Sequence, residues 1–276
     1  MVRGVGKTLI SVGVLLFLFV AYELWGTGLT ERREQSALKH RFATTPTTNP
    51  SAPPAEAETP VPGDALGLIK IPKLGLEKYV VEGVGTEDLK KGPGHYPTTP
   101  LPGQAGNAAI AGHRTTYGAP FNRLDELSKG DPILITTHEG QFRYEVDHSK
   151  VVSPSESSVL DNTPDNRLTL TTCNPKYSAA QRLIVVANLI GPVSPVKPAP
   201  PPAAPQLAEK AGLSGKNAAR APAIAWGSLA ALIWILAWAI GRRWRRWAAY
   251  ALATPVFLVV LFVFFENVSR LLPANI

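Results

Sequence analysis

The chain contains a single cysteine, Cys173, which lies at the end of the segment "RLTLTTC". Leucines alternate with threonines in this segment, and an apolar/polar period of two predicts a β-strand. Arg182 follows nine residues later and begins a second apolar segment, "RLIVVANLI". A hairpin-like connection between two such strands would place the thiol and the guanidinium at the same end of the sheet. The spacing therefore predicts a thiol beside a fixed positive charge.

A cysteine thiol has a pKa of about 8.5 and needs a neighbouring base or cation to act as a nucleophile at neutral pH. His113 is the best-placed of the five histidines, because in "NAAIAGHRTTYGAP" it follows an apolar strand and begins a polar loop. We therefore predict a catalytic set of Cys173, His113 and Arg182. Taken singly, each has an ordinary alternative: a small buried side chain, a loop residue and a solvated surface charge.

The charge distribution excludes a nucleic-acid-binding domain. The whole chain carries a formal net charge of +7, but residues 64–190 contain 13 basic and 14 acidic side chains. A nucleic-acid-binding domain would carry a basic face, and here the basic excess lies in the flanking segments. One cysteine also excludes an internal disulfide, and no Cys/His cluster or acidic loop has metal-ligand spacing. We predict no metal and no cofactor.

Three apolar segments predict membrane-spanning helices. Residues 1–29 hold a cytoplasmic tail and an apolar run, and residues 222–265 hold two apolar runs around the loop "GRRWRRW". Uncharged runs of about 20 residues are typical of transmembrane helices. A cleaved signal peptide is the alternative for the first run. No small-x-small cleavage site follows it, so we expect an uncleaved anchor.

The positive residues also predict the orientation of the chain. Because arginine and lysine mark the cytoplasmic side, the N-terminus and the arginine-rich loop should lie inside. Residues 64–190 and the tail 266–276 would then lie outside, at the cell surface. The segments 30–63 and 191–221 are rich in proline, alanine and threonine, a composition that favours extended stalks and linkers.

The sequence of residues 64–190 predicts a mainly β domain. Eight segments carry strand signals, and Gly, Pro and Asn separate them. These segments are 66–71, 77–83, 107–112, 132–137, 141–148, 150–153, 167–172 and 182–190. "FNRLDELSKG" predicts a short helix or helical turn. Eight strands in so short a domain favour a closed barrel or a sandwich.

Three elements together resemble a known family. "TLTTC", an arginine nine residues after the cysteine and "NAAIAGHR" sixty residues before it are similar to the sortases, the membrane-anchored cysteine transpeptidases of Gram-positive bacteria. The resemblance covers roughly residues 66–189. "TTCNP", the tyrosine in "HRTTYGAPF" and the proline-rich stalk most resemble class E sortases of actinobacteria. The implied fold is an eight-stranded sortase-like β-barrel.

The resemblance also implies roles for individual residues. Cys173 would attack the threonine carbonyl of an LPxTG-like sorting signal, His113 would act as general acid and then base, and Arg182 would bind the oxyanion. Tyr117 would contribute to a preference for LAxTG over LPxTG or would pack against Pro120. Thr172 would line the pocket or pack the strand. The mechanism requires sulfur, imidazole and guanidinium to converge at one end of the β structure.

The implied substrate groove lies over the strands that lead to the cysteine, with walls from residues 115–120 and 153–163. The implied partners are secreted proteins with an LPxTG/LAxTG-like signal, a peptidoglycan precursor amine and the lipid bilayer, with no nucleic acid. Two alternatives stay open: a pilin-polymerising sortase and a catalytically silent, membrane-tethered binding module. The additional C-terminal hairpin departs from the family, because most sortases have a single anchor.

Overall fold

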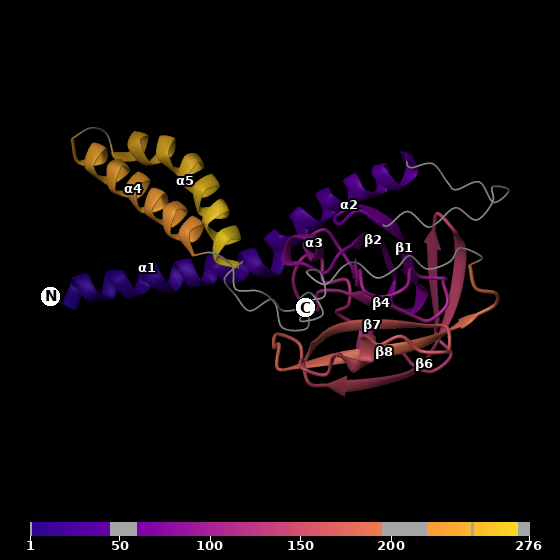
Figure 1. The fold of residues 1–276 in the computed structure, drawn as a ribbon. Helices are drawn as coiled ribbons and strands as arrows, with labels where there is room; N and C mark the ends of the chain where they lie inside the picture. The colour runs from indigo at the N-terminus through magenta and orange to yellow at the C-terminus, as the bar shows by residue number, and fades with distance from the viewer. Residues whose placement is uncertain (1, 45–59, 195–219, 244–245, 270–276) are drawn as a thin grey trace. The chain divides into compact units, whose positions relative to one another are not determined.

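The computed structural model describes residues 2–44, 60–194, 220–243 and 246–269. The chain forms two compact units (Figure 1). The first unit combines Met1–Leu24 with Asn217–Pro273 and holds apolar helices from both ends of the chain. The second unit, dominated by Trp25–Lys216, holds the β structure.

Helices α1 (Val2–Ala21), α4 (Ala221–Arg243) and α5 (Arg246–Ser269) belong to the first unit. Within the described ranges, three helices are long and apolar enough to cross a membrane, as the sequence predicted. Many of their apolar side chains are exposed, among them Phe17 and Leu252, a distribution that suits contact with lipid.

A π-helical turn, Tyr22–Gly26, connects α1 to a second helix, α2 (Thr27–Thr44), which belongs to the second unit. This helix differs from the prediction, because residues 30–44 were expected to begin an extended stalk. The prolines begin only at residue 46, and the sequence before them is rich in helix formers such as Glu, Gln, Arg, Leu and Ala. Residues 45–59 of the predicted stalk, and 195–219 of the predicted linker, lie outside the described residues.

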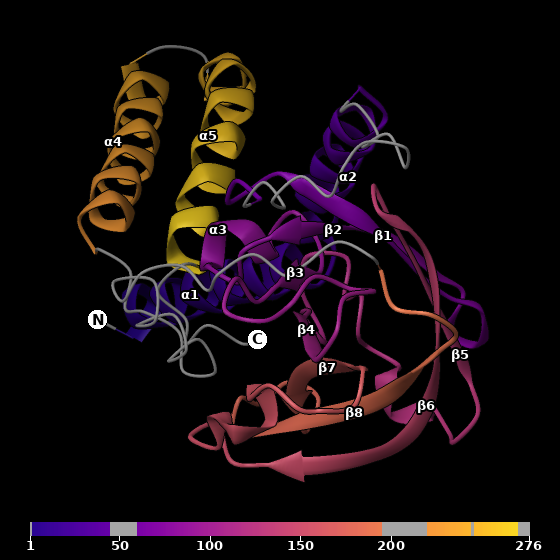
Figure 2. The same ribbon diagram turned by 45° about the vertical axis from the view of Figure 1, so that its right-hand side comes forward.

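Contacts with the β structure hold α2 in place. The helix runs along β1 and β2 (Figures 1 and 2). Leu38 is buried, and the Gln35 side chain accepts a hydrogen bond from the Tyr79 amide at 2.8 Å and donates one to the Tyr79 carbonyl at 2.9 Å. Packing against the barrel stabilises this helix in addition to its own propensity.

The strands of the second unit form a closed barrel in the order β1-β2-β3-β4-β7-β8-β6-β5 (Figure 2). The eight strands are β1 (Ala65–Ile71), β2 (Leu76–Glu82), β3 (Gly94–His95), β4 (Asn107–Ala111), β5 (Pro132–Thr137), β6 (Gly140–Val152), β7 (Arg167–Asn174) and β8 (Gln181–Ile190). Of the two predicted architectures, the closed barrel is confirmed and the sandwich is wrong. β4 pairs in parallel with β7, whereas β7 and β8 form an antiparallel hairpin.

Alternation along the strands fills the barrel interior with apolar side chains. Ile69, Ile110, Leu170 and Val185 come from four different strands and are all fully buried in one cluster. Burying a side chain of this size contributes roughly 1.5–3 kcal/mol. These side chains meet in one cluster, so the barrel has a packed apolar core.

Two strand predictions differ from the structure. Segments 141–148 and 150–153 are parts of the single strand β6, which has an irregular register between Val146 and His148. A bulge shifts the apolar/polar alternation by one residue, so the sequence shows two short strand patterns in place of one long one. The two-residue strand β3 is too short to give a periodic signal. The predicted helical turn is a 3-10 helix, Leu124–Glu126.

A buried ion pair links β2 to β3. Nδ1 of His95 lies 2.8 Å from Oε2 of Glu82, and Nε2 lies 2.9 Å from the carbonyl oxygen of Pro100. Both side chains are almost fully buried. Burial alone would lower the pKa of His95, but the Glu82 carboxylate and the hydrogen bonds raise it above its ordinary value of 6.5.

This pair predicts a pH dependence of stability. A histidine with a raised pKa in the folded state stabilises the fold fully below pH 6.5 and loses this contribution as the pH rises through the folded pKa. The melting temperature of the chain should therefore fall as the pH rises above 6.5. Glu82→Gln should cost about 1–3 kcal/mol and flatten this dependence. Asp147→Asn, at the exposed His148 pair, should leave the dependence in place; equal flattening in both variants would contradict the assignment.

Candidate active site

The β7–β8 hairpin sets Cys173 directly opposite Arg182. The two residues are cross-strand partners in the antiparallel register, and Asn174 pairs with Gln181 one step further toward the turn. Directly opposed residues in a hairpin have their Cβ atoms about 4.5–5.5 Å apart. The predicted proximity of thiol and guanidinium is thus a consequence of strand pairing.

The parallel pairing of β4 with β7 brings in the histidine. Ala111 pairs with Thr171, and the ladder continues, because the Gly112 amide donates to the Thr171 carbonyl at 3.1 Å. The Thr172 hydroxyl donates to the Gly112 carbonyl at 2.7 Å. If this register continued for one more residue, it would place His113 beside Cys173.

Alternation places Cys173 and Arg182 on the outer face of the barrel. In β7 and β8, the leucines and valines that alternate with them, such as Leu170 and Leu183, belong to the interior core. Cys173 and Arg182 therefore project outward. Two neighbouring strand ends thus present thiol and guanidinium on one face, and His113 lies two residues beyond the end of β4.

The site is closed in this structure. Cys173, His113 and Arg182 are exposed by only 2%, 6% and 2%. Burial raises the pKa of the Cys173 thiol, and the guanidinium groups of Arg182 and Arg114 oppose this rise without overcoming it. Burial therefore favours the protonated thiol over the thiolate. The histidine that the polar loop was expected to display is therefore buried.

Arg182 is held at the base of the turn. Its Nη1 donates to the carbonyl oxygens of Ala179 and Gln181 at 2.9 and 3.0 Å. These bonds fix the guanidinium next to the sulfur before any substrate arrives, which is the arrangement that an oxyanion-binding group needs.

Arg114 is a part of the site that the sequence analysis did not single out. It is buried, and its Nη1 donates to the Cys173 carbonyl at 2.9 Å and to Oδ1 of Asn174 at 2.8 Å. Its Nη2 lies 3.1 Å from a carboxylate oxygen of Asp125. The sequence feature that could have indicated its role is its position directly after the histidine, in "GHR". This side chain joins the histidine loop to the cysteine strand.

The two predicted substrate-binding residues have different surroundings. Thr172 is fully buried and its hydroxyl bonds to Gly112, a contact that fits the packing alternative. The Tyr117 ring lies 5.1 Å from the His113 ring, and Nζ of Lys90 lies 5.9 Å from its centroid. Tyr117 thus contacts the candidate acid–base residue itself.

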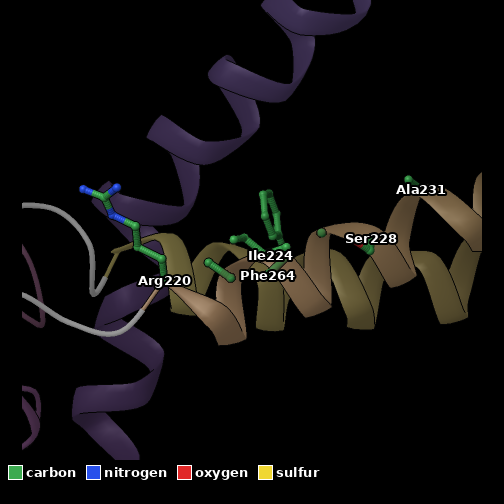
Figure 3. A pocket seen from close by; sticks show the side chains of 7 residues that line it. Arg220, Ile224, Ser228, Ala231 and Phe264 are labelled. Atoms are coloured by element: carbon green, nitrogen blue, oxygen red, sulfur yellow. The ribbon is translucent and has the colours of Figure 1, made fainter.

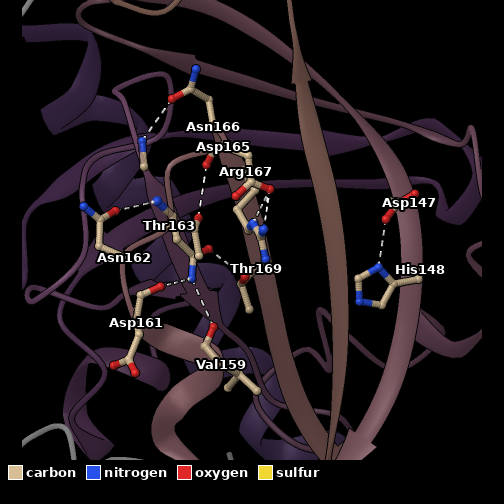
Figure 4. Close-up of polar contacts among 12 residues, drawn as sticks. Asp147, His148, Val159, Asp161, Asn162, Thr163, Asp165, Asn166, Arg167 and Thr169 are labelled. Carbon is tan, nitrogen blue, oxygen red and sulfur yellow. Dashed lines mark hydrogen bonds and ion pairs between the residues drawn. The ribbon is translucent and has the colours of Figure 1, made fainter.

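The connection between β6 and β7 crosses the outer face next to the site. It begins where Val152 pairs with Arg182, and Val159 packs against Ile184 and Val186 on β8. Its far end is fixed at the start of β4 (Figure 4), where the Asn107 side chain donates to two loop carbonyls. Asn162 accepts a hydrogen bond from the Asn107 amide at 3.0 Å. That residues 153–163 form a wall of the substrate groove stays a prediction.

A hollow in the first unit lies between α4 and α5 (Figure 3). Its lining is mainly apolar, with Ile224 and Phe264, and includes Arg220 and Ser228. It contains no nucleophile with a neighbouring base. Among the described residues, no group of three or more His, Cys, Asp and Glu side chains could hold a metal ion.

The position of Arg114 predicts an effect on the thiol. Arg114→Met removes a positive charge that lowers the pKa of Cys173, so the pKa should rise further and iodoacetamide should alkylate the thiol more slowly at neutral pH. The rate of alkylation against pH measures this shift. Arg123→Met, at an exposed pair with Glu126, should leave the profile unchanged. A profile that does not move in Arg114→Met would contradict the electrostatic role.

Comparisons with known proteins indicate the family of the β domain. Residues 69–190 match the family model "Sortase domain". Sortase SrtE1 of Streptomyces coelicolor is 35% identical over 208 residues, which cover 68% of this chain and 57% of that protein. Sortase SrtE2 of the same organism is 27% identical, covering 68% of this chain and 82% of that protein. The chain thus spans a little over half the length of SrtE1.

Among solved structures, a Clostridium perfringens Sortase D5 transpeptidase is 32% identical, with a TM-score of 0.48. The match covers 59% of this chain and 99% of that one. The resemblance that the cysteine, histidine and arginine motifs indicated, with its likeness to class E, is confirmed by the family match and the relatives. Residues 69–190 of the chain are therefore assigned to the sortase family as its sortase domain.

Proposed function

We propose that the chain is a cell-surface cysteine transpeptidase that cleaves an LPxTG/LAxTG-like sorting signal between threonine and glycine and transfers the protein to a cell-wall amine. One observation carries this proposal. Cys173 lies opposite Arg182 in the β7–β8 hairpin, and the β4–β7 ladder, which ends at Ala111 and Thr171, leads to His113 two residues further on. These residues would supply the nucleophile, the oxyanion donor and the acid–base group of the sortase domain.

The first step forms a thioester. The Cys173 sulfur attacks the threonine carbonyl carbon while its proton passes to His113, and the imidazolium then protonates the leaving glycine amine. Arg182 donates hydrogen bonds to the carbonyl oxygen as negative charge develops there. The products are an acyl-enzyme and a peptide with a free glycine amine.

The second step reverses the proton transfers. An incoming amine gives a proton to His113 and attacks the thioester carbonyl, and the proton returns to the sulfur as the new amide forms. We expect the amine to belong to a peptidoglycan precursor. A site that excludes water favours this aminolysis over hydrolysis, because water competes for the same thioester.

Burial of the thiol favours a second candidate function. A sulfur exposed by 2% in a closed site is also what a silent, membrane-tethered binding module would have. The two candidates differ in one measurable property, which is covalent capture of a peptide.

The test is acyl transfer to the full chain in detergent micelles. Incubation with LAxTG and LPxTG peptides should give an acyl adduct on Cys173 that hydroxylamine releases, and Cys173→Ala should give none. Arg182→Met should slow adduct formation by roughly 10²–10³-fold, the usual effect of removing an oxyanion donor. Arg143→Met, at an exposed ion pair, is the matched control. If neither peptide leaves an adduct on the wild-type chain, the result contradicts the transpeptidase function and favours the binding module.

We infer further that the chain spans the membrane three times with its barrel outside. The arginine-rich loop and the basic N-terminus support this orientation. In a Cys173→Ala background, a membrane-impermeant maleimide should label Ser155→Cys, at an exposed barrel position, on intact cells. Gly6→Cys, near the N-terminus, should be labelled only after the cells are lysed. The opposite pattern would reverse the proposed topology.

A further inference from the structure

The first turns of α2 contact the loop that follows His113. Oγ1 of Thr27 accepts a hydrogen bond from the backbone amide of Tyr117 at 3.1 Å. The two residues are 90 positions apart in the chain, and both are buried, with exposures of 1% and 5%. The anchor-proximal helix therefore provides a partner for a backbone group next to the candidate active site.

This loop has a backbone that needs support. Tyr117 and Ala119 have φ angles of 49° and 43°, and Gly118 between them has 73°. Non-glycine residues in the left-handed region cost free energy and persist only where their surroundings hold them. A side chain at Gly118 would also meet the Glu31 carboxylate, because a Cβ built there would lie 2.6 Å from Oε2. α2 thus packs directly against the strained segment.

α2 is itself fixed to the barrel on the same face. Glu31 is exposed by 1%, and its Oε1 lies 2.6 Å from Nζ of Lys78 on β2. One turn later, Gln35 bonds to the Tyr79 backbone in both directions. Thr27, Glu31 and Gln35 are four residues apart, so they share one side of the helix. This side joins β2 to the histidine loop.

The loop and the residue that follows it contact His113 at two points, one at the ring and one at the backbone carbonyl. The ring of Tyr117 lies 5.1 Å from the ring of His113, and the Phe121 amide donates to the His113 carbonyl at 3.1 Å. A shift of Tyr117 would therefore change the packing of His113. We propose that Thr27 and Glu31 are positioning residues of the active site, which hold the loop 114–120 so that His113 stays beside Cys173. This inference rests on the transpeptidase function proposed above.

The test compares isosteric variants of the full chain in detergent micelles. Thr27→Val keeps the shape of the side chain and removes its acceptor, so kcat with an LAxTG peptide and a glycine-based amine should fall roughly ten-fold, with little change in KM. Thr27→Ser retains the hydroxyl and should restore kcat. Glu31→Ala, which removes the side chain against Gly118, should also lower kcat. Ser36→Ala is the matched control, because this exposed serine bonds only within α2, to the Arg32 carbonyl.

Two further measurements separate positioning from loss of folding. Iodoacetamide should alkylate Cys173 in Thr27→Val at the wild-type rate, because Arg114 and Arg182 still flank the thiol. Hydrogen exchange of the Tyr117 amide should become faster in Thr27→Val and stay slow in Thr27→Ser.

Three outcomes would overturn the proposal: an unchanged or raised kcat in Thr27→Val, equal losses in the serine and valine variants, or unchanged exchange at Tyr117. If the wild-type chain forms no acyl adduct, the proposed function fails, and the exchange measurement still decides whether α2 supports this loop.

Discussion

The register between β4, β7 and β8 is the constraint on which the site depends. One pairing, Cys173 with Arg182, fixes sulfur against guanidinium, and the parallel ladder that ends at Gly112 determines where the histidine follows. A slip of one residue in either ladder would turn one of the groups toward the apolar interior, because side chains alternate between faces. Hydrogen bonds between backbones, made far from any substrate, therefore determine the chemistry.

Burial and charge act in opposite directions on the sulfur. The closed site disfavours a thiolate and raises the pKa of Cys173, whereas two guanidinium groups nearby favour it. Because burial dominates, the thiol stays protonated until the site opens or a base takes the proton. Such a balance disfavours reaction of an isolated thiol while leaving it near the positive charges that would activate it.

Much of the second unit could be predicted from local pattern. Alternation located most strands, and the position of Cys173 and Arg182 at facing strand ends followed from it. The long strand β6 was divided in two, because a register irregularity near His148 inverts the alternation. The two-residue β3 gives no periodic signal, yet it carries His95 into a buried pair with Glu82.

Long-range contacts explain the rest of what the sequence did not show. The proline-rich composition that follows α2 led to the prediction of a stalk in place of a helix. The contacts that hold α2 on the barrel join Gln35 to residues 44 to 56 positions away in the chain. Arg114 was visible beside the histidine, but nothing local indicated that it would reach the Cys173 carbonyl. No local pattern encodes such contacts, since each depends on how the barrel closes.

The candidate groups Cys173 and Arg182 lie on the outside of a barrel whose interior holds a packed cluster of apolar side chains. Enzymes that bury their reactive groups within the core must trade rigidity against activity, because both draw on the same residues. Here the residues that stabilise the core and the residues of the candidate site lie on opposite faces of the same strands. Evolution or a protein engineer could therefore repack positions such as Ile69 or Val185 for thermal tolerance while the reacting surface kept its shape.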